Sequence, residues 1–415
     1  MFKIRQDEAA RSRSVPARPD DFTITFSEPG LGIRPAALAP AAGFGSAEPT
    51  SAWPARRSDR ELDPSPGDAG PPILYPDGTV TFTVHDFQTG TNFVASFHCP
   101  LYSGRHARPA ELLDGHRAWA RAFDLFADDD DYARFCAARF DDLVSAQRHM
   151  LSLEAALVVS HLMTWFFVYD DVQERQDARN LGGSTVTHRA VRRHLEVLDG
   201  DSPRARDSPT LFAFADLLRQ ARQLDASDDE WYRRTVEHLR EYLYGTLGEG
   251  SLDPPTGANT ALHWQVRQLT AGVPPGCVLT AGALRIVPSF GTGDVFVRRM
   301  EQLNINYNVW INDLLGLNRD QRDGLHNTIL ILRNEFGLSL EQATRMSAHH
   351  SDQELRAFLN IERELPRLLG ETWRSEAANI AAYGEVLKGC MRGLVDWTAS
   401  SHRYLAAKDM SLRGG

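Results

Sequence analysis

Hydrophobic residues recur every three or four positions along most of the chain from residue 108 to residue 409. This spacing puts them on one face of a helix, as in PAELLDGHRAWARAFDLF and GEVLKGCMRGLVDWTASSHRYLAAK. Proline, glycine and short polar residues separate the helical stretches, for instance in GDSPRARDSP and GVPPG. Neither an alternating strand pattern nor a repeat of fixed period occurs between them. The pattern therefore predicts an all-α fold, in which one large domain of helices forms a bundle.

The first part of the chain has a different pattern. Residues 1–75 are rich in Pro, Ala, Gly, Arg and Ser without a sustained apolar period, which predicts a disordered extension. The runs TVTFTV (79–84) and NFVASF (92–97) contain β-branched and aromatic residues and predict a small hairpin, with a structured loop as an equal alternative. They belong to an N-terminal segment, residues 76–107, that could cap a pocket. Residues 410–415 are read as a tail.

Composition narrows the class of protein. Of 415 residues, 42% are hydrophobic and 24% are charged, as expected for a globular protein, and the formal net charge of -10 argues against nucleic-acid binding. The chain has neither an apolar run of about 18 residues nor the apolar core of a signal peptide. We therefore expect a cytoplasmic protein without stable membrane insertion. Four scattered cysteines without a CxxC pair indicate reduced thiols.

Two acidic residues follow an unusually apolar segment in TWFFVYDDVQE. Asp170 and Glu174 are four positions apart, so on a helix they lie within about 40° of each other. Carboxylate oxygens are ligands that Mg²⁺ prefers, commonly together with substrate phosphates. The pair is therefore a candidate half of a metal and diphosphate site on a buried, central helix. The alternative is a solvated acidic helix end, and we assign ADDDDYARF (residues 127–135) to such capping.

A second polar cluster lies in VWINDLLGLNRDQRDG. Asn312, Gly316 and Asp320 follow one another at intervals of four and form a stripe on a helix. Asn and carboxylate oxygens suit Mg²⁺, and the adjacent Arg319 could pair with a phosphate. Polar residues near a helix end are common, so ordinary capping remains the alternative for this cluster taken alone.

Together the two clusters resemble the motifs of the class I terpene synthases of bacterial type. The family's aspartate-rich DDxxD/E motif is matched at residues 170–174, and its (N/D)Dxx(S/T/G)xxxE triad is matched at residues 312–320. The resemblance covers about residues 95 to 409. Two positions depart from the family pattern. Gly316 replaces the usual Ser or Thr, so that a water would have to supply the ligand, and Asp320 is one methylene shorter than the usual Glu.

Further features fall where the resemblance implies them. Arg267 lies 45 residues before Asn312, the place of the family's diphosphate-sensing arginine. The following TAGVPPG, which contains Ala271, is similar to the helix interruption that carries the effector carbonyl. Arg403 and Tyr404 match the family's Arg-Tyr pair that donates hydrogen bonds to diphosphate. The resemblance also implies that Asp171 pairs with Arg403 on closure rather than binding metal.

The implied function is that of a Mg²⁺-dependent terpene synthase. It would ionise a linear isoprenyl diphosphate, farnesyl diphosphate being the expected substrate, and release diphosphate and a cyclised terpene hydrocarbon or alcohol. Three Mg²⁺ ions are implied, with Mn²⁺ able to substitute. The implied metal ligands are Asp170, Glu174, Asn312, Asp320 and, through water, Gly316. The residues implied in catalysis and diphosphate binding are Asp170, Arg267, Arg319, Arg403 and Tyr404. The candidate pocket residues are Phe166, Phe167, Ala271 and Trp310, with ordinary helix packing as the alternative for the aromatic ones.

Two other functions stay open at this point. A chain-elongating prenyltransferase has the same helical fold, but resembles a pattern with two aspartate-rich motifs. A non-catalytic protein that binds isoprenoid diphosphates would keep the fold and lose the activity. The chain could act as a monomer or as a homodimer.

Overall fold

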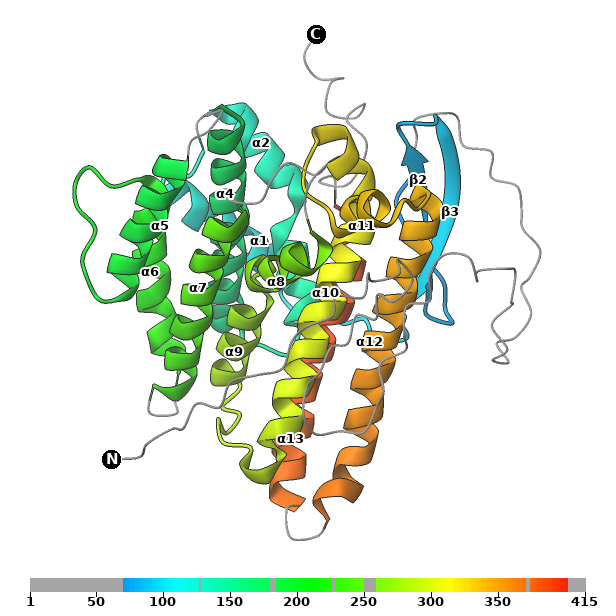
Figure 1. Ribbon diagram of the computed structural model, residues 1–415. Coiled ribbons are helices and arrows are strands. Elements are labelled where there is room, and N and C mark those ends of the chain that lie inside the picture. The colour runs from blue at the N-terminus through cyan, green and yellow to red at the C-terminus, as the bar shows by residue number, and fades with distance from the viewer. Residues whose placement is uncertain are drawn as a thin grey trace, which may run out of the picture. The chain divides into compact units, whose positions relative to one another are not determined.

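The structure is a computed structural model, drawn as a ribbon in Figure 1. It describes residues 70–126, 128–179, 184–225, 229–249, 259–370 and 374–401. Within these ranges, the side chains of residues 171–179, 184–187, 292 and 374–375 are not described. The predicted extension up to residue 69, the predicted tail, Arg403 and Tyr404 therefore lie outside the described residues.

Three antiparallel strands open the described chain, in the order β1 (Ile73–Leu74), β2 (Thr79–Asp86) and β3 (Thr91–His98). The two runs that predicted a hairpin lie in β2 and β3. Their alternation has a packing cause, because every second side chain of β2, including Val80, is buried in the core. β1 was not expected, and its pairing with β2 means that ordered chain begins before residue 76.

Helices make up nearly all of the remaining described chain, so the predicted all-α fold is confirmed. In chain order they are α1 (Pro109–Ala122), α2 (Asp129–Ala138), α3 (Phe140–Gln147), α4 (Leu153–Arg179), α5 (Ser184–Leu198), α6 (Pro209–Leu224), α7 (Glu230–Glu249), α8 (Thr260–Thr270), α9 (Val273–Ala283), α10 (Asp294–Asp323), α11 (Thr328–Phe336), α12 (Leu340–Leu369) and α13 (Arg374–Thr398), with a 3-10 turn at Gly291–Gly293. As expected, the acidic run before α2 caps that helix, since the Asp128 side chain accepts a hydrogen bond from the Asp131 backbone N–H.

Helix α4 is buried on several sides, as its apolar sequence predicted. It packs against α1, α3, α6 and α9. Trp165 is fully buried, stacks on Phe214 with ring centroids 4.6 Å apart and stacks on Tyr169 at 4.9 Å. Burial on several sides explains why apolar residues are not confined to one stripe of this helix. The aromatic packing brings Asp170 to the edge of the core.

The long helix α10 packs along α12 and α13, and Figure 1 shows it in yellow beside the orange α12, with β2 and β3 nearby. Before it, α8 and α9 are separated by a break, as the GVPPG segment predicted. Gly272 lies at this break with a φ of 65°, a left-handed conformation that favours glycine. Prolines occupy the first turn of α9, where a missing N–H costs little.

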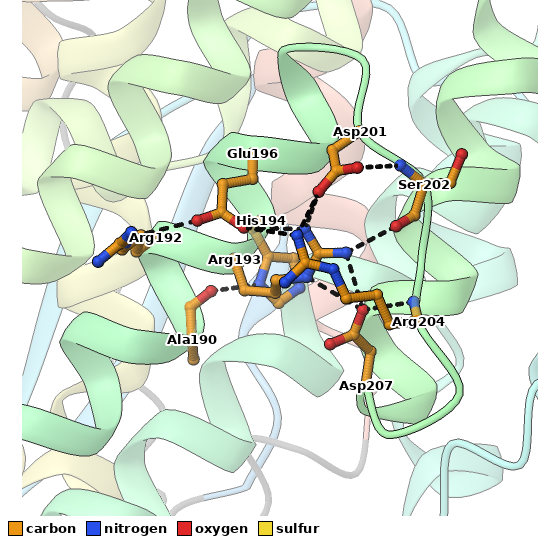
Figure 2. A network of polar contacts seen from close by, with 9 residues as sticks. All are labelled: Ala190, Arg192, Arg193, His194, Glu196, Asp201, Ser202, Arg204 and Asp207. Carbon is orange, nitrogen blue, oxygen red and sulfur yellow. Dashed lines mark hydrogen bonds and ion pairs between the residues drawn. The ribbon is translucent and has the colours of Figure 1, made fainter.

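A polar network fixes the loop after α5. Arg193 contacts Glu196 (2.9 Å), Asp201 (2.7 Å), Asp207 (3.0 Å) and the backbone oxygen of Ser202 (2.6 Å), as Figure 2 shows. One planar guanidinium thus joins the helix to three points of the loop that leads to α6.

Two smaller expectations can be compared with the structure. All four cysteines are free thiols, and three of them are buried. Across the described ranges, the helices include none that combines the length and the apolar character needed to cross a membrane.

Candidate metal and diphosphate site

The first part of the site lies where the buried portion of α4 ends. Asp170 is half-buried and follows the fully buried Tyr169. Its charge affects the neighbouring phenol of Tyr242. Burial is the largest cause that raises the pKa of Tyr242 well above its usual value, and the charge of Asp170 is the second. The backbone of α4 continues to Arg179, so Asp171 and Glu174 lie on this helix as expected. Their side chains are outside the described part of the structure.

The second part lies on α10. Asn312 is half-buried, while Gly316 and Asp320 are buried on the same helix. Burial raises the pKa of Asp320 to about 6, against the opposing effects of Arg319 and of a hydrogen bond from Asn327. That hydrogen bond runs from Asn327 Nδ2 to Asp320 Oδ2 over 2.8 Å.

Arg267, on α8, contacts the second part directly. Its Nη2 donates to Asn312 Oδ1 over 2.7 Å and to Asp313 Oδ1 over 3.2 Å. Asp313 is 1% exposed and is held from the other side by Thr328, whose backbone N–H donates to Oδ2 over 3.0 Å and whose hydroxyl donates to the same atom over 2.5 Å. The guanidinium of Arg267 therefore lies directly beside the first residue of the triad.

The electrostatics around Arg267 identify the centre of the site. Burial opposes its charge, but the carboxylates of Asp313, Glu249, Asp170 and Asp320 together raise the pKa of the guanidinium. These acids come from three helices, α4, α7 and α10. The structure thus places residues of both sequence motifs within electrostatic reach of one half-buried arginine.

Glu249, at the end of α7, is a site residue that sequence reasoning missed. Burial raises its pKa to about 7, Arg267 opposes this shift, and Asp170 adds to it. The hydroxyl of Thr270, next to the helix break, donates a hydrogen bond to its carboxylate. A single glutamate in YGTLGEG gives no motif, so nothing in the sequence singled it out. Asp313 was also missed, although it occupies the second position of the triad motif.

The donor set suits a hard divalent cation. It consists of carboxylate and amide oxygens. Burial is the main cause of the raised pKa values of Glu249 and Asp320, and neighbouring carboxylates add to both shifts. A bound cation would offset that charge. Where side chains are described, no three His, Cys, Asp or Glu residues converge closely enough to hold one metal ion. Among these acids, Asp313 contacts Arg267, and Glu249, Asp170 and Asp320 act on its charge.

The two candidate pocket phenylalanines face different neighbours. Phe166 packs against Tyr242 with centroids 4.5 Å apart, and a Cβ on Gly272 would come within 3.3 Å of its ring. Phe167 is half-buried and stacks on Phe140 of α3 at 4.1 Å. Phe166 thus lies at the helix break, where half-buried Ala271 ends α8, and Phe167 lies toward α3.

Trp310 and Arg319 have other surroundings. Trp310 stacks on His350 with ring centroids 5.5 Å apart and lies tilted against Trp264 at 4.3 Å, contacts of the kind that the helix-packing alternative describes. Arg319 lies 3.8 Å from Asp323 and lowers the pKa of Asp320 against the dominant effect of burial. Its position beside the triad is that expected from the sequence.

Comparison with known proteins decides the family. The family model described as terpene synthase family 2, C-terminal metal binding, matches residues 161–357, a range that includes Asp170, Arg267 and the triad. The chain belongs to the class I terpene synthases of bacterial type. The predicted enzyme class, a carbon–oxygen lyase acting on phosphates, is thereby confirmed.

The synthase is similar to several bacterial relatives over most of their length. It is 24% identical to germacrene A synthase of Nostoc punctiforme, across 74% of this chain and 94% of the relative. It is 29% identical to pentalenene synthase of Streptomyces exfoliatus, across 74% and 92%. Among solved structures, α-eudesmol synthase has 19% identity and a TM-score of 0.64, covering 73% of this chain and 98% of that one. Linalool/nerolidol synthase from Streptomyces clavuligerus has 23% identity, a TM-score of 0.60 and coverage of 73% and 99%. These structures share the fold.

Proposed function

We propose that this synthase is Mg²⁺-dependent, ionises a linear isoprenyl diphosphate and directs the cation to a terpene hydrocarbon or alcohol. The observation that carries the proposal is the group of carboxylates and Asn312 around Arg267, because such crowded negative charge suits cations and a guanidinium suits diphosphate. Farnesyl diphosphate is the proposed substrate. One relative is named (+)-T-muurolol synthase ((2E,6E)-farnesyl diphosphate cyclizing), which supports this choice.

The metal site would be formed by both motifs. The proposed ligands are Asp170, Glu174, Asn312, Asp320 and, through a water, Gly316. When bound, Mg²⁺ would supply Lewis-acid stabilisation of the leaving diphosphate. Three ions are proposed from the family resemblance, and Mn²⁺ is expected to substitute. The short Asp320 side chain accepts a hydrogen bond from Asn327, and such a partner restricts the rotation of a ligand carboxylate.

The arginines would bind the diphosphate itself. Arg267 is directed toward Asn312 and can donate to an anion bound beside that residue. Arg319, Arg403 and Tyr404 are proposed to donate to the same group. Asp171 is proposed to pair with Arg403 when the site closes.

The hydrocarbon part of the substrate would lie beyond the diphosphate, near the break between α8 and α9. Phe166 packs against both Tyr242 and this break, so an aromatic face lies close to the acids. Aromatic faces stabilise desolvated cations by about 0.5 to 2 kcal/mol each. Phe167, Ala271 and Trp310 remain proposed as further pocket residues. Dense packing of these side chains would also exclude the water that quenches a carbocation.

The test is incubation of the purified protein and Mg²⁺ with C10, C15 and C20 isoprenyl diphosphates. Diphosphate release and gas chromatography with mass spectrometry report the reaction and its products. We expect turnover of the C15 substrate, and a decrease of about 10²- to 10³-fold in Asp170→Ala or Asn312→Ala because charge stabilisation of the leaving group is lost. The matched control is Asp130→Ala, which removes an exposed acid from the first turn of α2 and should leave turnover unchanged.

Absence of release from all three substrates would contradict the proposal, as would full activity in either alanine variant. Addition of isopentenyl diphosphate separates it from a chain-elongating prenyltransferase, which would yield longer products. Calorimetry separates it from a non-catalytic binding protein, which would bind Mg²⁺ and diphosphate without turnover.

A further inference from the structure

Strand β2 is paired on one side by β3 over its whole length, but β1 covers the other side only at Val80 and Thr81. Beyond these residues, side chains of α10 take the place of a neighbouring strand. Asn318 Oδ1 accepts a hydrogen bond from the His85 backbone N–H over 2.9 Å, and Asn318 Nδ2 donates to the Thr83 carbonyl over 2.9 Å. One amide thus reproduces the paired donor and acceptor of a β-ladder.

A second amide extends this contact. Gln321 Nε2 donates to the His85 carbonyl over 3.0 Å. Strand β3 is attached to α12 in a similar way, because the His98 backbone N–H donates to Asp352 Oδ1 over 2.7 Å. The hairpin is therefore joined to α10 by three hydrogen bonds from two amide side chains, and it is also anchored to the helix that packs beside α10.

The position of these amides along α10 is informative. Asn318 lies midway between Gly316 and Asp320, and Gln321 directly follows Asp320. Residues two apart on a helix point about 200° apart, so Asn318 lies opposite the triad. The last turns of α10 are consequently held on their outer face by β2, while on the other side Asn327 Nδ2 donates to Asp320 Oδ2 and to the Asp313 carbonyl, each over 2.8 Å.

This placement matters because two of the three triad residues have shorter side chains than the family pattern. Asp320 has one methylene fewer than a glutamate, and Gly316 has no side chain. Functional sites need their ligands within about 0.5 Å of the productive geometry. A short side chain has few torsions with which to correct a displaced helix, so accuracy must come from the position of the α10 backbone.

We propose that the β2–β3 hairpin is a positioning element of the metal site, with Asn318 and Gln321 as positioning residues. By fixing the rotation and height of the last turns of α10, they hold Asn312, Gly316 and Asp320 where these residues bind metal. The proposal rests on the proposed metal-binding role of the triad and goes beyond it by assigning a role to the hairpin.

The experiment uses the full chain and the variant Asn318→Ala, with Asn92→Ala as matched control. Asn92 is an exposed amide of the same hairpin, and its Oδ1 lies 2.6 Å from Nδ1 of the His85 side chain. Calorimetry measures binding of inorganic diphosphate over a series of Mg²⁺ concentrations, and a turnover assay follows the same series. Loss of an indirect support of a metal ligand typically weakens metal affinity by about 10- to 100-fold. We expect the half-saturating Mg²⁺ concentration to rise about tenfold in Asn318→Ala and not in Asn92→Ala.

Further variants keep the outcome decisive. Gln321→Ala loses one hydrogen bond instead of two and is expected to shift the half-saturating concentration by about threefold. Asn318→Asp keeps the acceptor for His85 and should partly rescue metal affinity. Thermal unfolding of each variant accompanies the titrations. A merely structural hairpin would lower Tm but leave the half-saturating Mg²⁺ concentration of the folded protein unchanged, and that result would overturn the proposal.

The proposed function can fail separately. If Asn312→Ala leaves binding and turnover intact, the triad is not a metal site, and both proposals fall. If Asn312→Ala abolishes Mg²⁺-dependent diphosphate binding while Asn318→Ala and Gln321→Ala behave like the wild type, only the positioning role is wrong.

Discussion

Arg193 and Arg267 each lie among several carboxylates, yet the two clusters differ in kind. Arg193 bonds directly to Glu196, Asp201 and Asp207, which lie on α5 and on the loop that follows it (Figure 2). Hydrogen bonds from Arg193 are the largest cause of the lowered pKa values of Asp201 and Asp207. The charged forms of Asp201 and Asp207 are therefore more stable in the folded protein than in water, and this pair of acids needs no further cation.

Around Arg267 the shifts have the opposite sign. Burial raises the pKa of Glu249 to about 7 and that of Asp320 to about 6. Arg267 offsets only part of the cost, so these acids hold charge that the protein alone does not compensate. The comparison shows that a count of ion pairs does not identify the functional cluster. Burial also raises the pKa of carboxylates elsewhere, as at Asp352. What marks the Arg267 cluster is therefore the raised pKa values together with the position of these acids near both sequence motifs.

The same substitution in both clusters gives the largest contrast. Arg267→Lys loses the fork that contacts Asn312 and Asp313 together, since an ammonium is a single point of charge. We expect kcat/KM for diphosphate release to fall about 10²-fold. Arg193→Lys should keep kcat/KM within about twofold of the wild type, because the contacts of Arg193 join α5 to the following loop and do not involve Asn312 or Asp313. Equal losses in the two variants, measured by steady-state kinetics, would remove the distinction between the clusters.

A smaller effect is expected on stability when Asp320 is neutralised. Its pKa is about 6 in the folded protein, against 3.8 for an aspartate of the unfolded chain. Between these pH values the folded state binds more protons than the unfolded state, so stability falls as pH rises. Asp320→Asn removes this penalty. Without metal, we expect the free energy of unfolding to increase by about 1 to 3 kcal/mol near pH 8. Near pH 3, where the carboxyl is protonated in both states, the gain should vanish. Urea denaturation at both pH values measures it, and a destabilised variant near pH 8 would refute the account.

The matching change in the Arg193 cluster should have the smallest effect on stability, and the effect should have the opposite sign. The pKa of Asp207 lies below 3.8 chiefly because Arg193 donates a hydrogen bond to it. The contribution of the Asp207 carboxylate to the stability of the fold is therefore present above pH 3.8 and is lost as the pH falls through the lowered pKa. Asp207→Asn should therefore lower Tm slightly near neutral pH and leave it unchanged in strong acid. Thermal scans across pH measure this, and a raised Tm near neutral pH would show that the Arg193 cluster is not satisfied.

Local spacing explains what could be predicted about the fold. The three- and four-residue period predicted the helices, the acidic run before α2 predicted a cap, and GVPPG predicted the break at Gly272. Each depends on residues within one or two turns. β1 was missed because two residues carry no period, and it exists only through its pairing with β2.

The candidate site divides in the same way. Asp170, Asn312 and Asp320 were recognisable because each motif lies within one helix. Glu249 has no motif, and its raised pKa comes from burial and from charges on other helices. The sequence also could not predict the neighbours of Phe166 and Phe167, because adjacent residues of a helix point in different directions and the packing of other helices decides what each one contacts.

By itself, the sequence determined a helical protein with two metal-type motifs and a sensing arginine between them, because helical period and motif spacing are properties of neighbouring residues. Only the tertiary structure decided that Arg267 meets Asn312 across 45 residues and that Asn318 pairs with the edge of β2 across more than 200. These contacts follow from how helices pack and what they bury. They also determine which carboxylates are satisfied and which remain available for a cation.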